Sequence, residues 1–299
     1  PRHGKSELVS RRIPAYILGK NPKASIIASS YGADLARLMN RDVQRIIDSP
    51  LYGQVFPNTS LFGKNIRTVA TGNWLRNSDI FEVVTHGGYY RGSGVGGAIT
   101  GMGMQYGIID DPFKNRQDAD SPTIRESVWN WFISTFRTRL AKDGGLLLIV
   151  TRWHDDDLAG RLLTLADLDP LADKWEVLSF PAVAEEPIAD YDQRQPGEAL
   201  WPARFDLNTL ASIRANSEYE WQALYQQRPR ARDGGMFKRD WFEIVPGVKG
   251  SNVQRVRYWD KAGTKDGGAY TAGVLLALSG GVYYVEDVIM GCVTQAGEQ

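Results

Sequence analysis

The chain has 299 residues, a length that suggests two domains, or one domain and part of another. With 42% hydrophobic and 23% charged residues, its composition excludes a disordered, collagen-like or coiled-coil protein. No run approaches the roughly 20 apolar residues of a membrane helix, and a single cysteine, Cys292, excludes an internal disulfide and a thiolate zinc cluster. The formal charge is zero, but residues 1–100 carry 13 basic against 6 acidic side chains (net +7) and residues 151–200 carry 4 against 12 (net −8), which permits a basic face for a polyanion.

Helical and strand-like patterns alternate over the first 180 residues. Helical spacing of apolar residues is seen at residues 6–18, where Pro14 disturbs it, and at residues 33–48, 123–140 and 156–165. Strand-like runs occupy residues 24–29, 80–85, 105–110, 146–151 and 175–180. This alternation predicts an α/β fold with a largely parallel sheet covered on both faces, with ligands at the carboxyl ends of its strands.

The pattern changes after residue 180. Residues 181–202 are rich in Pro, Glu and Asp, a helix is predicted at 207–226, and residues 228–240 combine basic residues with Pro and Gly, as in a connector. A second block then predicts strands at residues 253–260, 269–278 and 281–289, the last two joined by a turn at Ser279-Gly280. The sequence therefore predicts three regions, residues 1–180, 181–250 and 251–299.

The first candidate for chemistry is Gly4-Lys5-Ser6 at the start of a predicted helix. It matches the second half of the phosphate-binding loop G-x-x-x-x-G-K-[ST], in which backbone N–H groups hold phosphates, the lysine reaches the β and γ oxygens and the serine ligates Mg²⁺. The first glycine of the loop would precede Pro1, and the chain has no initiator methionine, so we expect a fragment. Alone, this short match favours an ordinary helix start.

The second candidate lies at the end of the strand predicted for residues 105–110. Asp110 and Asp111 follow an apolar run there. A nucleotide hydrolase needs such a pair, because one acid holds Mg²⁺ through its water shell and the next orients the attacking water. Two acids that begin a turn before Pro112 are the alternative. Together with Lys5 and the alternating pattern, the pair favours a nucleotide hydrolase.

Two further segments belong near this pair. Residues 87–103 hold so many glycines that we predict a loop rather than a strand. This loop would contact phosphate or another chain; a flexible linker is the alternative. Thr151 and Arg152 follow an apolar strand, where a hydroxyl could sense the γ-phosphate and a guanidinium could neutralise transition-state charge. His154 has no metal-ligand spacing to another histidine, so we expect it to form hydrogen bonds or to pack.

The order and spacing of these motifs resemble the large subunit of tailed-phage terminases, the motors that package viral DNA. The matching segments are residues 1–6, 87–112, 151–158, the Leu-Trp-Pro run at 200–202 and the Tyr-Gln-Gln-Arg-Pro run at 225–229. The resemblance implies an additional-strand P-loop ATPase core over residues 1–180, whose beginning is missing. It further implies a lid or linker over 181–250 and the start of a ribonuclease-H-like nuclease domain over 251–299.

The resemblance also implies roles for single residues of the ATPase. The phosphate loop would comprise Arg2, His3, Gly4, Lys5 and Ser6, with Arg2 as its arginine. Ser6 and Asp110 would hold Mg²⁺, and Thr151 would belong to the coupling motif. Asp111 stands where the family often has glutamate, one methylene longer, and it would position the attacking water.

In the last block, the resemblance implies a two-metal nuclease site that uses Mg²⁺ or Mn²⁺. Asp260, at the end of a predicted strand, resembles the first nuclease acid, and Asp266 resembles an auxiliary one. From spacing alone, a mixed-charge surface loop over residues 261–268 is the favoured interpretation, and only the resemblance points to a nuclease. We expect the remaining acids of the site beyond Gln299. Glu286 and Asp287 on the third predicted strand are nearer alternatives, but we interpret them first as charges on an edge strand.

The resemblance thus implies an ATPase that moves double-stranded DNA into a procapsid, with endonuclease cutting of concatemeric DNA by the full-length protein. Its partners would be ATP, duplex DNA held through the phosphate backbone, a portal protein, a small terminase subunit and further copies in a ring. It would act in the host cytoplasm, docked on the procapsid, without a membrane. Two alternatives are another ATP-driven DNA translocase or helicase, and a nucleotide-binding module without turnover.

Overall fold

A computed structural model of the chain describes residues 1–63, 66–67, 74–229, 242–250, 252–260 and 271–291. The chain divides into two compact units, Pro1–Arg232 and Asp233–Gln299, and the division falls within the region predicted as lid or linker. No helix in the described residues is long and apolar enough to cross a membrane.

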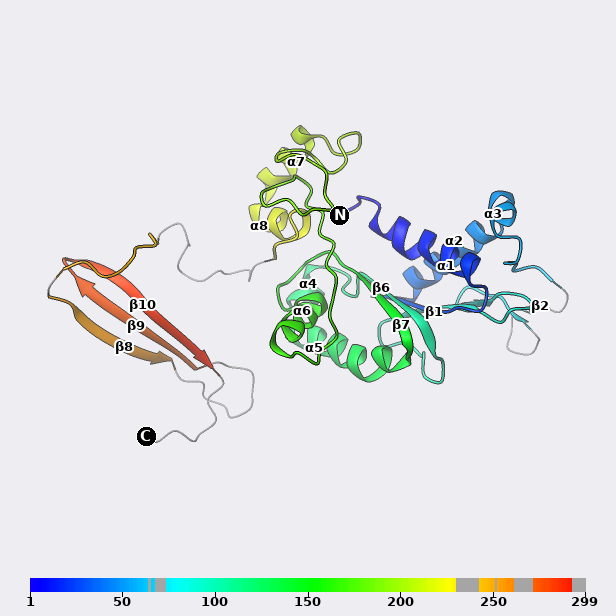
Figure 1. Cartoon of the computed structure of the whole chain (residues 1–299), viewed down its shortest axis with the longest axis horizontal. Helices are drawn as coiled ribbons and strands as arrows, with labels where there is room; N and C mark the ends of the chain where they lie inside the picture. Colours follow the sequence, from blue (N-terminus) through cyan, green and yellow to red (C-terminus); the bar gives the residue numbers. More distant parts are fainter. Residues whose placement is uncertain (64–65, 68–73, 230–241, 251, 261–270, 292–299) are drawn as a thin grey trace. The chain divides into compact units, whose positions relative to one another are not determined.

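Helices and strands alternate through the first unit (Figure 1). Its helices are the π-helix η1 (Glu7–Arg12), α1 (Ile13–Lys20), α2 (Ala33–Ile47), α3 (Pro50–Val55), α4 (Arg116–Asp120), α5 (Pro122–Trp131), η2 (Phe132–Phe136), η3 (Arg137–Arg139), α6 (Leu158–Leu168), α7 (Leu207–Asn216), α8 (Glu218–Glu220) and η4 (Trp221–Tyr225). Its strands are β1 (Ser25–Ser30), β2 (Ile66–Arg67), β3 (Trp74–Leu75), β4 (Ile80–Glu82), β5 (Tyr89–Gly94), β6 (Met104–Asp110) and β7 (Leu140–Ile149).

The main sheet has five strands in the order β4-β5-β1-β6-β7. β1 pairs in parallel with β5 and β6, β7 runs parallel to β6, and β4 is antiparallel to β5. The mostly parallel sheet predicted from the alternating pattern is therefore confirmed. In the register of the sheet Asp110 lies between Ser30 and Ile149, so three strands end at one edge, beside the last residue of β6.

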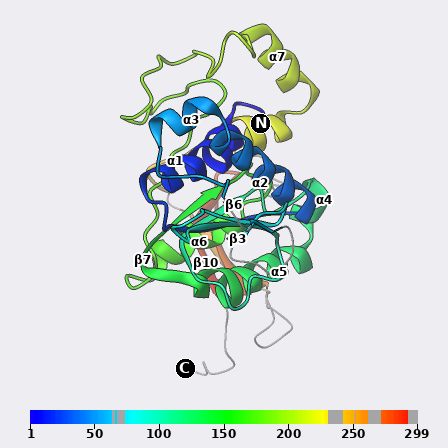
Figure 2. The same cartoon turned by 90° about the vertical axis from the view of Figure 1, so that its right-hand side faces the viewer.

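The sheet is buried on both faces. Helices α1, α2 and α3 lie on one side, and α5 and α6 on the other (Figures 1 and 2). Alternate residues of a strand enter opposite cores: Ile26 and Ile108 pack with the first helices, whereas Ile27 and Ile109 pack with the later ones. Full burial of one such side chain contributes about 1.5–3 kcal/mol, so the two cores hold the strand ends in register.

The glycine-rich segment differs from the prediction. Residues 89–94 form β5 instead of a loop, and the loop begins after Gly94. Glycine is required there because α2 packs directly on the strand: a Cβ on Gly94 would lie 2.9 Å from the backbone nitrogen of Ala33, and one on Gly92 would lie 3.0 Å from the carbonyl oxygen of Ala36. These glycines therefore bring helix and strand together.

Of two other predicted elements, one is wrong and one is wrong in part. Residues 175–180 form no strand. The Ser179 backbone N–H donates to the Tyr191 hydroxyl (2.8 Å), and the Ser179 hydroxyl donates to the side-chain oxygen of Gln227 (2.9 Å). Side chains therefore take the place of a neighbouring strand. The helix predicted for residues 207–226 is interrupted at Ser217, whose hydroxyl caps α8 by accepting a bond from the Glu220 amide.

The described strands of the second unit form an antiparallel sheet in the order β10-β9-β8. They are β8 (Gln254–Asp260), β9 (Thr271–Ser279) and β10 (Val282–Gly291). The predicted hairpin is present, but its turn lies one residue later than the predicted Ser279-Gly280, because Ser279 ends β9. Gly280 and Gly281 form the turn with positive φ values of 58° and 79°.

We expect Gly94→Ala to lower the free energy of unfolding by about 1–3 kcal/mol, because the added methyl must push α2 away from β5. Thermal denaturation followed by circular dichroism measures the change. Gly53→Ala in α3 is the matched control, because a Cβ there meets nothing within 4 Å. An unchanged melting temperature for Gly94→Ala would contradict the close packing.

Candidate functional site

Five of the predicted site residues meet at the carboxyl edge of the main sheet. The Lys5 ammonium donates to the Asp111 carboxylate (3.0 Å) and to the Thr151 hydroxyl (2.5 Å). The Ser6 hydroxyl, one residue further along the loop, donates to the Asp110 carboxylate (3.1 Å). The fold thus joins the start of a helix to the ends of two neighbouring strands, as expected for ligands of a parallel sheet.

Asp110 is the most buried acid of this group, with 1% of its surface exposed. Its other carboxylate oxygen accepts a bond of 2.6 Å from the hydroxyl of Ser10. Burial raises the pKa of Asp110, the neighbouring charge of Asp111 adds to this, and the bonds from Ser10 and Ser6 oppose it. A buried carboxylate held by neutral hydroxyls would gain from a nearby cation.

Asp111 leaves the strand in an unusual backbone conformation, with φ of 46°. Its backbone N–H still donates to Ile149 (2.8 Å), and its carbonyl accepts from Tyr31 (3.1 Å), so both neighbouring strands fix this position. Its carboxylate accepts a second bond, 2.7 Å long, from the Thr151 backbone N–H. The carboxylate is therefore directed to Lys5 and Thr151 and away from Asp110.

The loop over residues 1–6 carries the left-handed conformations that a tight turn needs, at Arg2 (φ 59°) and Gly4 (φ 85°). Arg2 is exposed, and its predicted catalytic role stays a prediction. The ring of His3 lies 4.7 Å from that of Phe205, and burial lowers the pKa of His3. The region after residue 181 thus contacts the loop directly.

The donor set fits Mg²⁺ and a polyphosphate. Ser6 and Asp110 offer hydroxyl and carboxylate oxygens, the hard ligands that Mg²⁺ prefers. Lys5 and the beginning of the helical segment that follows it offer a cation and the positive end of a helix dipole to anionic oxygens. Lys5 forms an ion pair with Asp111, so a phosphate that binds Lys5 would have to replace this carboxylate.

Arg152 is engaged elsewhere than the sequence predicts. Its guanidinium donates to Asp157 (2.8 Å), a buried acid that also caps α6 by accepting from the Gly160 amide (2.9 Å). His154 accepts a bond from the Asp156 amide (3.0 Å), in line with the hydrogen-bonding role expected for it. Nowhere in the described ranges do three or more His, Cys, Asp or Glu side chains gather as a metal site.

Arg116 connects the loop after β7 with the helices near residue 220. Its guanidinium forms two bonds to Glu220 (3.1 and 2.7 Å) and donates to the carbonyl of Trp153. It also lies over the rings of Tyr219 (4.7 Å) and Trp153 (5.4 Å). Arg116 therefore links the loop that contains Thr151 to α8 through direct contacts.

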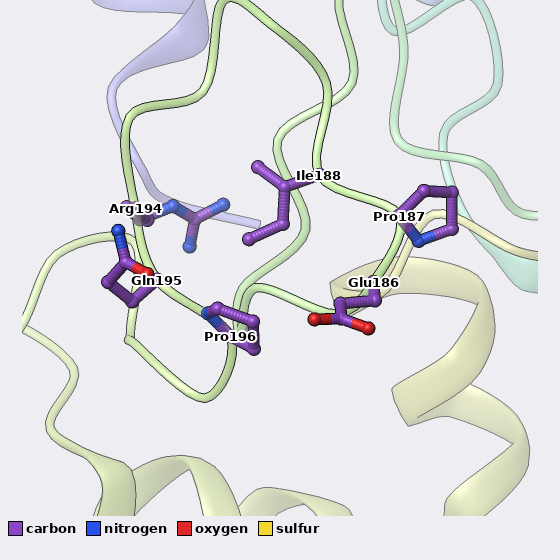
Figure 3. Close-up of a pocket in the computed structure, with 6 residues that line it drawn as sticks. All are labelled: Glu186, Pro187, Ile188, Arg194, Gln195 and Pro196. Carbon is purple, nitrogen blue, oxygen red and sulfur yellow. The ribbon is translucent and has the colours of Figure 1, made fainter.

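A hollow lies on the surface of the region after residue 181. Its lining consists of Glu186, Pro187, Ile188, Arg194, Gln195 and Pro196 (Figure 3). Arg194 and Ile188 face each other across it, and the Arg194 guanidinium is held by Asp192 (2.7 Å). No lining residue belongs to the predicted site, and the hollow lacks a free acid–base pair, so we assign it no chemistry.

The predicted nuclease acids are not gathered in the described part of the second unit. Asp260 is exposed at the end of β8, and Asp266 lies outside the described residues. Glu286 and Asp287 form ion pairs with Arg255 (2.7 Å) and Arg257 (2.5 Å), as edge-strand charges do. The nuclease assignment of Asp260 stays a prediction.

The sequence interpretation missed Ser10 and Arg116. Ser10 lies four residues after Ser6, which is one helical turn, so the helical spacing was a usable signal for a second hydroxyl on the same face. Arg116 gives no such local signal, because its partners lie 37 and 104 positions away in the chain.

The profile of one protein family matches residues 1–244; its description is "Terminase large subunit, T4likevirus-type, N-terminal". The match covers most of the chain, includes all the residues that converge at the sheet edge, and ends before Asp260. No curated protein gives a significant match.

We expect Asp110→Asn to raise the melting temperature of the ligand-free protein, because the amide avoids the cost of burying a charge. A single stabilising substitution typically adds about 0.5–2 kcal/mol. The raised pKa of Asp110 means that the folded state binds the proton more tightly than the unfolded state, so wild-type stability should increase as the pH falls toward that pKa. The difference in melting temperature between Asp110→Asn and the wild type should therefore shrink at lower pH. A lower melting temperature for Asp110→Asn at neutral pH would contradict this.

Proposed function

Because the chain belongs to the T4-like family of terminase large subunits, the ATPases of phage DNA packaging, we propose that its first unit binds Mg²⁺–ATP at the sheet edge and hydrolyses it to move DNA. The observation that carries this proposal is the convergence of Lys5 on Asp111 and Thr151, beside the bond from Ser6 to Asp110. The three segments that carry these residues, 5–6, 110–111 and 151, are far apart in the sequence and meet at the place where a nucleotide's phosphates would bind.

In this proposal each side chain has a separate task. Ser6 and Asp110 hold Mg²⁺, which when bound neutralises phosphate charge. Lys5 leaves Asp111 for the β and γ oxygens, and the freed carboxylate of Asp111 accepts a hydrogen bond from the attacking water. Arg2, on the exposed part of the loop, adds positive charge near the phosphates.

The contacts of Lys5 also support a coupling role for Thr151. Lys5 cannot turn toward phosphate without weakening its bond to the Thr151 hydroxyl, so occupancy of the site is communicated to the loop after β7. Trp153 on that loop is bound to Arg116, which holds Glu220. We propose that this path carries the effect of nucleotide to the region after residue 181.

DNA and the packaging partners are proposed on less specific grounds. Residues 1–100 carry a net charge of +7, which suits a non-specific grip on the phosphate backbone of duplex DNA. A portal protein, a small terminase subunit and a ring of identical subunits follow from the terminase assignment. For the second unit we propose the beginning of a metal-dependent nuclease, with Asp260 as one of its acids.

In the full-length protein, we expect Lys5→Ala to reduce ATP turnover by roughly 10²–10³-fold, because a charge aimed at the transferred phosphoryl group is lost. Phosphate release under saturating ATP measures the effect. Lys20→Ala is the matched control: it removes an exposed lysine from the end of α1, away from the sheet edge. Near-normal turnover by Lys5→Ala would remove the assigned site.

For Asp111→Asn we expect ATP binding that is at least as tight as in the wild type, because Lys5 is released from a competing carboxylate, together with slow hydrolysis. Equilibrium binding of a fluorescent ATP analogue and single-turnover hydrolysis separate the two effects. Loss of Mg²⁺-dependent binding in this variant would mean that Asp111, rather than Asp110, holds the metal.

Asp260→Ala should abolish metal-dependent cutting of plasmid DNA by the full-length protein while ATP hydrolysis continues. The reason is that Asp260 belongs to the second unit, whereas the proposed ATP site belongs to the first. Plasmid cleavage with Mg²⁺ or Mn²⁺ and phosphate release are measured on the same preparation. Glu286→Gln is the control, because Arg255 already holds that carboxylate. Cutting that survives Asp260→Ala would overturn the nuclease assignment.

A further inference from the structure

The Leu-Trp-Pro run at residues 200–202 leads into a tight turn that presents Arg204. The carbonyl of Trp201 accepts bonds from the backbone N–H groups of Arg204 (3.0 Å) and Phe205 (2.8 Å). The guanidinium carbon of Arg204 lies 5.3 Å from the centre of the Trp201 ring and 5.8 Å from that of Phe205. The two rings therefore restrict the orientation of an exposed arginine.

The same two aromatic residues touch the phosphate loop. The Phe205 ring lies 4.7 Å from the ring of His3, and a Cβ placed on Gly4 would lie 3.9 Å from the Trp201 ring. Arg204 is thus held beside the loop that contains Lys5. The positive charge of Arg204 also contributes to the lowered pKa of His3, after the larger effect of burial, as expected for neighbours.

Arg204 differs from the other arginines of residues 181–229 in its charge environment. Arg194, Arg214 and Arg228 form ion pairs with Asp192, Glu218 and Glu185, at 2.6–2.7 Å. Within the part of the chain that the structure describes, no acid forms an ion pair with Arg204. Its N–H donors therefore remain free for an anion, and a planar guanidinium suits bidentate binding of phosphate oxygens.

We propose that Arg204 binds the phosphate groups of the nucleotide, reaching them from the region after residue 181 while Lys5 reaches them from the loop. The inference rests on the proposed function and adds a residue to it. Bound phosphate would hold the turn at residues 201–205 against the loop. A phosphate of the DNA backbone is the other source of the same chemistry, and the experiment separates the two.

The test compares Arg204→Gln, Arg204→Lys and the matched control Arg214→Gln in the full-length protein. Affinity is measured for a non-hydrolysable ATP analogue with Mg²⁺, for inorganic tripolyphosphate and for duplex DNA. Arg204→Gln should lower the affinity for the ATP analogue and for tripolyphosphate by about 10–100-fold, the range expected for a charge-assisted hydrogen bond to phosphate. Arg204→Lys should retain part of the affinity, and Arg214→Gln should change it less than about twofold.

Unchanged affinity of Arg204→Gln for either polyphosphate would overturn the inference, as would a loss confined to DNA binding. The melting temperature of ligand-free Arg204→Gln should stay close to that of the wild type, because the exposed guanidinium forms no ion pair with any described residue. Lys5→Ala is measured in parallel. If it loses the ATP analogue while Arg204→Gln does not, only the role of Arg204 fails; if the wild type binds no nucleotide, the proposed function fails as well.

Discussion

The position of one desolvated carboxylate determines the geometry of the whole site. Asp110 ends strand β6, which lies between β1 and β7, with almost no exposed surface, and two hydroxyls from successive turns of the first helical segment bind its two oxygens. This arrangement fixes the distance and orientation of helix and strand at the sheet edge. Lys5 and Asp111, the residues next to Ser6 and Asp110 in the chain, are brought together as a consequence.

Part of the fold could be predicted from the sequence because one local pattern determined it. β1, α2 and β6 have regular apolar spacing, and each is buried on the sides that the spacing predicts. β5 was missed because its glycines serve the close approach of α2, a tertiary requirement that no propensity reports. The apolar residues 175–180 satisfy their backbone through Tyr191 and Gln227, which the sequence pattern does not indicate.

The candidate site follows a similar division. Lys5, Ser6, Asp110, Asp111 and Thr151 could be predicted because strands of a parallel sheet end together, and the structure brings these five into hydrogen-bonding distance. Contacts made by the region after residue 181 could not be predicted in this way. Arg116 contacts Trp153 and Glu220, and Phe205 contacts His3, only because segments far apart in the sequence pack together. No local sequence pattern indicates such packing.

The sequence separations at the site bear on how the protein folds. Lys5 meets Asp111 across 106 positions and Thr151 across 146. The entropy of closing such long loops must be overcome before these contacts contribute any stability, which makes parallel sheets slow to form. The strands and both cores must therefore be in register before lysine, carboxylate and hydroxyl can meet. An intermediate with isolated helices or hairpins has no part of the assembled site, so binding competence should emerge late in folding, in one cooperative step.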